Sequence, residues 1–152
     1  MIQLITGEKG KGKTKVLLDK ANTVIKEAHG NIVYLDKSSK HMYQLNNKIR
    51  LIDVSSFGLA NSDQFIGFIY GILSQDHDLE QMYLDSFLKI ASTDEENANA
   101  VLAKLDEIGK AYNVTFVVSI SVKSDAIDAA YKENIIADCG NSGNESIWRC
   151  DS

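Results

Sequence analysis

An eight-residue glycine-rich segment near the N-terminus constrains this chain more than any other feature. The segment Gly7-Glu8-Lys9-Gly10-Lys11-Gly12-Lys13-Thr14 matches the pattern G-x-x-x-x-G-K-[ST] at every fixed position. A short apolar run, residues 1–6, precedes it, and residues 13–28 carry apolar side chains at helical spacing. The sequence therefore predicts a strand, a glycine-rich loop and a helix in direct succession, with Gly30 ending the helical pattern.

Apolar runs and helical patterns alternate along the rest of the chain. Further strands are expected at residues 31–36, 49–54, 79–84 and 114–122, with a last one at 147–150 after a turn-rich loop at 139–146. Helices are expected at residues 65–73, from Ser92 to about Ile108, and at 125–133. Strands that alternate with helices need crossover connections. The pattern therefore predicts an α/β fold, a mainly parallel sheet with helices on both faces.

Two of these helices have recognisable starts. The polar group Asn61, Ser62 and Asp63 precedes the apolar helix at 65–73. Two overlapping capping boxes, Ser92 with Glu95 and Thr93 with Glu96, are expected to begin the later helix.

Length and charge limit the functions that this chain can have. Its 152 residues, 44% of them hydrophobic, predict a single domain over residues 1–152. With 16 basic and 21 acidic residues the net charge is −5, which disfavours nucleic acid as a partner. The longest apolar stretch, residues 65–73, is too short to span a membrane, and the N-terminus lacks a secretory signal. We therefore expect a cytoplasmic protein without a membrane partner.

The glycine-rich segment has the chemistry of a phosphate site. Glycines let successive backbone N–H groups point at phosphate oxygens, and the following helix adds its positive end. The Lys13 ammonium can reach the β- and γ-phosphates, and the Thr14 hydroxyl can bind Mg²⁺. The predicted nucleotide-binding residues are Gly7, Glu8, Lys9, Gly10, Lys11, Gly12, Lys13, Thr14 and Lys15.

A bound Mg²⁺ needs a carboxylate from a neighbouring strand as well as the threonine. Asp85 follows the apolar residues 82–84, at the end of the strand predicted at 79–84. Thr14 and Asp85 are therefore the predicted metal residues, although an aspartate in this acidic stretch could also be a solvated cap.

These motifs resemble those of the P-loop NTPases, and among them the RecA-like branch. Asp85-Ser86-Phe87 is similar to the end of the branch's Walker B strand, and the helix through 105–109 with the strand at 113–118 is similar to the helix and sensor strand that follow. The resemblance covers residues 1–122 and implies an ATPase that uses Mg²⁺. The branch commonly has a glutamate near the end of the second strand to activate water, whereas this chain has Asp36 followed by Lys37.

Three functions follow from these patterns. The first is an ATPase that hydrolyses slowly, with Lys13 and Asp36 as the catalytic residues, because aspartate is shorter than the expected glutamate. The second is an ATP-dependent binding module with little or no turnover, acting on an unknown protein partner or as a homo-oligomer. The third is a small nucleoside kinase, which the presence of only two arginines, Arg50 and Arg149, disfavours. No N/T-K-x-D stretch is present, which favours adenine over guanine.

Overall fold

The computed structural model describes residues 1–139 and contains six strands and four α-helices within them. The strands are β1 Ile2–Thr6, β2 Asn31–Asp36, β3 Arg50–Asp53, β4 Leu79–Leu84, β5 Thr115–Ile120 and β6 Ile135–Asp138. The α-helices are α1 Lys13–Val24, α2 Ser62–Gln75, α3 Phe87–Ile90 and α4 Glu95–Tyr112. Short 3₁₀ helices lie at Met42–Gln44, Val54–Phe57, Ser124–Ala126 and Ala129–Asn134.

The six strands form one sheet in the order β3-β2-β4-β5-β1-β6, and every neighbouring pair is parallel. This confirms the predicted parallel sheet. Because the strands are parallel, all of their carboxyl ends lie at one edge, where ligands bind in open α/β sheets. The strand that precedes the glycine-rich loop, β1, is separated from β4 by β5. The groups that follow β1 and β4 must therefore meet across one intervening strand.

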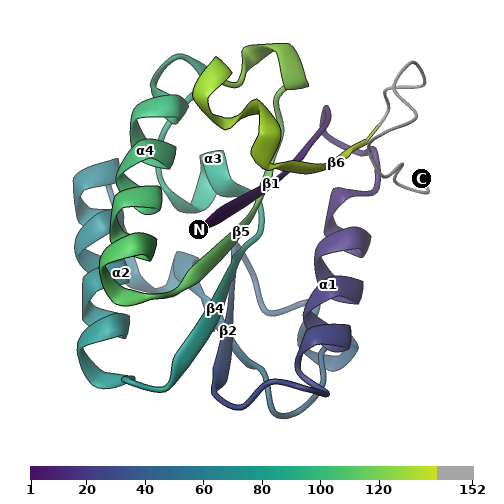
Figure 1. Ribbon diagram of the computed structural model, residues 1–152, viewed down its shortest axis with the longest axis vertical. Coiled ribbons are helices and arrows are strands. Elements are labelled where there is room, and N and C mark those ends of the chain that lie inside the picture. Colours follow the sequence, from purple (N-terminus) through teal and green to yellow (C-terminus); the bar gives the residue numbers. More distant parts are fainter. Residues whose placement is uncertain (140–152) are drawn as a thin grey trace.

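Helices cover both faces of the sheet, as predicted: α1 lies against one face, and α2 and α4 lie against the other (Figure 1). Side chains alternate between the two resulting cores along each strand. In β2, Val33 and Leu35 join the core with α2 and α4, whereas Ile32 and Tyr34 join the core with α1. Tyr83 of β4 lies on the α1 face too. Within residues 1–139, no helix is both long and apolar enough to cross a membrane.

The start of α4 corrects the prediction of two capping boxes. Asp94 is the N-cap, and its side chain accepts a hydrogen bond from the backbone N–H of Asn97. Ser92 has a left-handed backbone, with φ of 52°, and its hydroxyl donates to the carbonyl of Leu59 at 3.1 Å. The chain turns at Ser92 after the short helix α3, which the sequence patterns did not predict. The prediction for α2 is confirmed, because Asn61 caps it through the N–H of Gln64.

The region after β5 differs from its prediction. The helix expected at 125–133 is replaced by two 3₁₀ helices, and β6 follows them, where no strand was expected. β6 pairs with β1 and so extends the sheet beyond the strand that leads into the glycine-rich loop. The strand predicted at 147–150 lies outside the described residues. Cys139, which directly follows β6, is buried and is not a free thiol.

Candidate functional site

The glycine-rich loop, residues 7–12, connects β1 to α1 at the carboxyl edge of the sheet. Gly7 lies so close to the end of β6 that an added Cβ would stand 2.4 Å from the carbonyl oxygen of Cys139. Its backbone N–H donates to the carbonyl of Val122 at 2.8 Å. Gly12, with φ of 87°, is the N-cap of α1 in a left-handed conformation that side chains disfavour. Glycine at both positions therefore follows from the path of the loop.

The N-terminus of α1 is built to face an anion. No side chain caps it, and its first turn contains no acidic residue but does contain Lys13 and Lys15. The first N–H groups of a helix lack partners within the helix and carry a partial positive charge. Lysines at this end repel that charge unless an anion lies between them. The local electrostatics therefore favour a phosphate here.

Lys13 is the buried cation of the site. Only 7% of it is exposed, and its Nζ donates to the carbonyl oxygen of Glu8 at 2.9 Å, so the side chain lies back across the loop. Burial lowers the pKa of Lys13, and the negative charge of Asp85 opposes that shift. The other lysines of the segment, Lys9, Lys11 and Lys15, are exposed.

Asp85, directly after β4, lies beside the start of α1. The Thr14 hydroxyl donates to Oδ1 of Asp85 at 3.1 Å, across the strand that separates β4 from β1. The hydroxyl of Tyr34 donates to Oδ2 of the same carboxylate at 2.8 Å. Asp85 is 2% exposed, and its backbone N–H donates to the carbonyl of Leu35. The structure therefore brings together the two residues that were predicted to hold a metal.

Tyr34 was not singled out in the sequence as a site residue. Burial raises the pKa of its phenol, and the adjacent carboxylate of Asp85 raises it further. The phenol therefore stays protonated and acts as a donor. Its only sequence signal is a tyrosine among the apolar residues of 32–35, which is also typical of an ordinary core position.

The donor set of Thr14 and Asp85 fits Mg²⁺. Magnesium prefers oxygen ligands and usually takes one or two protein groups together with water and substrate phosphates. Within residues 1–139, no group of three or more His, Cys, Asp or Glu side chains is arranged to hold a metal on its own. A hydroxyl and a carboxylate beside a helix N-terminus without a side-chain cap are a donor set that suits a metal bound together with an anionic ligand.

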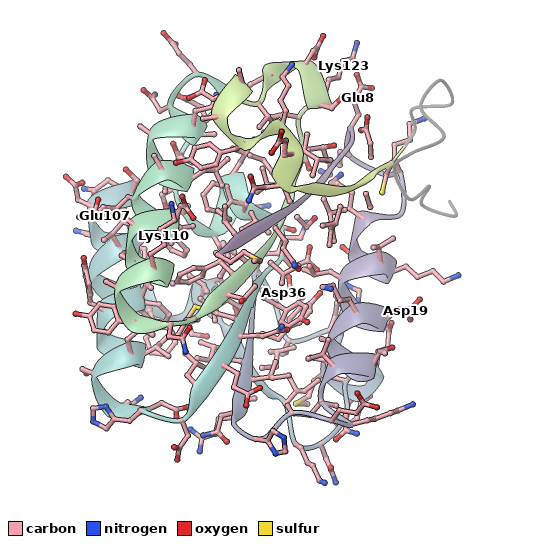
Figure 2. The ribbon with its side chains drawn as sticks, in the orientation of Figure 1. Glu8, Asp19, Asp36, Glu107, Lys110 and Lys123 are labelled. Atoms are coloured by element: carbon pink, nitrogen blue, oxygen red, sulfur yellow. The ribbon has the colours of Figure 1, made fainter. Side chains whose placement is uncertain are left out.

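Asp36 ends β2 and lies apart from the loop. It is 1% exposed, its Oδ1 accepts from the backbone N–H of Lys37 at 2.7 Å, and its Oδ2 is buried without a hydrogen-bond partner. Burial raises the pKa of Asp36, and the negative charge of Asp85 adds to the shift. Figure 2 shows Asp36 inside the molecule, well away from Glu8 and Lys123 at the rim of the loop. The structure therefore places Asp36 near Asp85 and gives it no contact with Lys13.

An open cleft of about 510 Å³ lies beside the first half of the loop. Gly7, Glu8 and Lys11 line one side, and residues 123–125 with Asp138 and Cys139 line the other. An exposed ion pair, Lys123 with Glu8 at 3.6 Å, crosses its rim (Figure 2). The sequence patterns missed this cleft because they did not predict β6, whose last residue, Asp138, lines it together with Cys139.

Comparison with known proteins places the fold. No protein-family model matches the sequence, and no curated protein matches it. Among solved structures, the KaiC-like protein of the hyperthermophilic archaeon Pyrococcus horikoshii is similar, with a TM-score of 0.59 and 20% sequence identity. The match covers 87% of this chain and 66% of that protein, so this chain spans about two thirds of its length. The fold is therefore the RecA-like α/β fold that the sequence predicted.

Proposed function

We propose that this chain binds ATP with Mg²⁺ at residues 7–15 and hydrolyses it slowly. The observation that carries the proposal is the contact between Thr14 and Asp85 at 3.1 Å, formed beside a helix N-terminus that has no side-chain cap. The N-terminus of α1, which suits an anion, thus lies next to Thr14 and Asp85, whose oxygens suit a metal. A nucleoside triphosphate with its metal is the ligand that satisfies both.

Each part of the loop has a role in this proposal. Backbone N–H groups of residues 8–14 surround the phosphates, and the exposed lysines Lys9, Lys11 and Lys15 add positive charge at the rim. Lys13 exchanges its hydrogen bond with the Glu8 carbonyl for one with a phosphate oxygen. Thr14 and Asp85 would hold Mg²⁺, which would neutralise negative charge on the phosphates when it is bound.

Slow turnover follows from the state of Asp36. Catalysis of phosphoryl transfer depends on positioning and electrostatic stabilisation, and a residue that orients the attacking water adds to it. Asp36 is the candidate for that role, but its carboxylate is buried, and no hydrogen bond connects it to the loop. We therefore assign Asp36 weak assistance as a base and Lys13 the stabilisation of charge on the transferred phosphate.

The second candidate function is a nucleotide-dependent binding module with little or no turnover. The unpartnered Oδ2 of Asp36 favours it, because an aspartate closed off from water cannot activate a water molecule in this conformation. The partner would then be a second protein or another copy of this chain. Steady-state hydrolysis of ATP separates the two functions.

Calorimetric titration with ATP tests the shared part of both functions. We expect one site per chain, tighter with Mg²⁺ than in EDTA. Lys13→Ala should weaken binding about 10- to 100-fold, the range for a hydrogen bond to a charged group. Lys20→Ala, which changes another lysine of α1 outside residues 7–15, is the matched control and should bind as the wild type does. Absence of binding of ATP, GTP and their diphosphates by the wild type would overturn the proposal.

A further inference from the structure

The carboxylate of Asp85 has a separate hydrogen-bond donor on each oxygen. Oδ1 accepts from Thr14 at 3.1 Å, and Oδ2 accepts from the hydroxyl of Tyr34 at 2.8 Å. The two donors come from α1 and β2, which lie on different sides of β4 in the chain's topology. A carboxylate held at both oxygens cannot rotate without breaking one bond. The plane of the Asp85 carboxylate is therefore fixed by Tyr34 as much as by Thr14.

This arrangement matters for the orientation of Thr14. A threonine hydroxyl that binds a cation does so through an oxygen lone pair, which leaves its hydrogen to be donated elsewhere. In this structure the hydrogen is donated to Oδ1 of Asp85. The direction of the Thr14 lone pairs therefore depends on the position of Oδ1 of Asp85. Tyr34 acts on the other end of the same carboxylate.

We propose that Tyr34 is a positioning residue of the Mg²⁺ site, whose hydroxyl holds the Asp85 carboxylate in the orientation that orders the Thr14 hydroxyl. This inference rests on the proposed function, because it assumes that Mg²⁺ binds at Thr14 and Asp85. Tyr34 touches neither nucleotide nor metal and acts through Asp85. Partners of metal ligands typically change metal affinity by 10- to 100-fold.

The neighbouring tyrosine provides a matched control within the same core. Tyr83 of β4 is as fully buried as Tyr34, and the two rings stack with centroids 6.2 Å apart and planes within 9°. The hydroxyl of Tyr83, however, donates to Gln81 on its own strand and not to Asp85. Removing one hydroxyl or the other thus changes the same apolar surroundings but only one of the two contacts with the site.

The experiment measures ATP affinity as a function of Mg²⁺ concentration for the wild type, Tyr34→Phe and Tyr83→Phe. We expect Tyr34→Phe to raise the Mg²⁺ concentration at half-saturation about 10- to 100-fold and to leave affinity in EDTA unchanged. Tyr83→Phe should leave both within about twofold. In an Asp85→Asn background, Tyr34→Phe should have a much smaller effect on Mg²⁺, because Tyr34 acts through the carboxylate.

Other results would contradict either the inference about Tyr34 or the proposed metal site. A Mg²⁺ midpoint of Tyr34→Phe within about twofold of the wild type, or equal shifts for both tyrosines, would overturn the inference while the proposed function stands. If the wild type binds ATP with no dependence on Mg²⁺, the proposed metal site itself is wrong. A second experiment uses only the wild type and so does not depend on whether a variant folds. With ADP bound, the signal of the buried hydroxyl proton of Tyr34 should shift in the NMR spectrum when Mg²⁺ is added. The signal of the Tyr83 hydroxyl proton should not shift. An unchanged Tyr34 proton would contradict the inference.

Discussion

Asp36 ends β2 and Asp85 directly follows the adjacent strand β4, at the same edge of the sheet, yet their surroundings differ. Leu35 pairs with Leu84, so Asp36 and Asp85 are next in register. Each aspartate follows a leucine that packs on the α2 and α4 side of the sheet. Both are almost fully buried. Asp85 has a donor on each oxygen, whereas Asp36 has one donor and one oxygen without a partner. Two carboxylates at equivalent positions in the sheet thus differ in how completely their oxygens are hydrogen-bonded.

The difference shows that partners, and not position in the sheet, define the site. Asp85 faces the start of α1 and receives Thr14 from it, while Asp36 leads into the connection to β3, with Lys37 as its hydrogen-bond donor. Burial raises the pKa of Asp36, and repulsion from the neighbouring negative charge of Asp85 raises it further. We infer that the Asp85 carboxylate is oriented to bind a cation. The charged form of Asp36, in contrast, is disfavoured by its surroundings.

The largest effect is expected from removing the partnered pair. Thr14→Ala and Asp85→Ala should each weaken Mg²⁺-dependent binding of ATP about 10- to 100-fold, because each removes an oxygen that acts on the same ion. The double variant should lose less than the sum of the two free-energy changes, since the residues are in contact. Calorimetry in the presence of Mg²⁺ and in EDTA measures this. Strictly additive losses would mean that the two residues act independently.

A smaller effect is expected from Asp36 on catalysis. Asp36→Asn should lower kcat for ATP hydrolysis by about tenfold or less, well below the 10²- to 10⁴-fold that a well-placed base contributes. Wild-type turnover itself should lie below the enzyme median of about 10 s⁻¹. Steady-state phosphate release measures both quantities. A loss above about 100-fold would show that Asp36 reaches the attacking water in the nucleotide-bound state.

The smallest effect concerns the cost of keeping Asp36 charged. The pKa of Asp36 in the folded chain is raised above the ordinary value of 3.8. In the pH interval between 3.8 and this higher pKa, the folded state keeps a proton that the unfolded state has released. Stability therefore falls as pH rises through this interval, and the ionised carboxylate is destabilising at pH 7. Asp36→Asn should raise Tm at pH 7, because asparagine carries no charge to bury. The gain should vanish below pH 3.8, where Asp36 is protonated in both states. A lower Tm at pH 7 would contradict the conclusion that the ionised carboxylate of Asp36 is destabilising.

Features with a strong local cause could be predicted from the sequence. The strands at β1, β2, β4 and β5 and the helix α1 follow from apolar runs and helical spacing, and the loop follows from its glycines. The pairing of Thr14 with Asp85 was predicted because both types suit Mg²⁺ and both follow strands. These predictions depend on short segments whose composition is distinctive.

Features that depend on tertiary contacts could not be predicted. β6 has only three apolar residues and becomes a strand because β1 offers it an edge. Ser92 is a good capping residue by type, but its hydroxyl donates to the carbonyl of Leu59, and Asp94 takes the cap. Tyr34 could not be connected with Asp85, which follows another strand, until the register of the sheet was known.

The central claim is that Asp85, and not Asp36, belongs to the metal site. The most direct test makes the same isosteric change at both positions and compares Asp85→Asn with Asp36→Asn in titrations of ATP affinity against Mg²⁺. We predict that Asp85→Asn raises the Mg²⁺ concentration at half-saturation about 10- to 100-fold, while Asp36→Asn leaves it within about twofold of the wild type. Equal shifts for the two variants, or a larger shift for Asp36→Asn, would contradict the account.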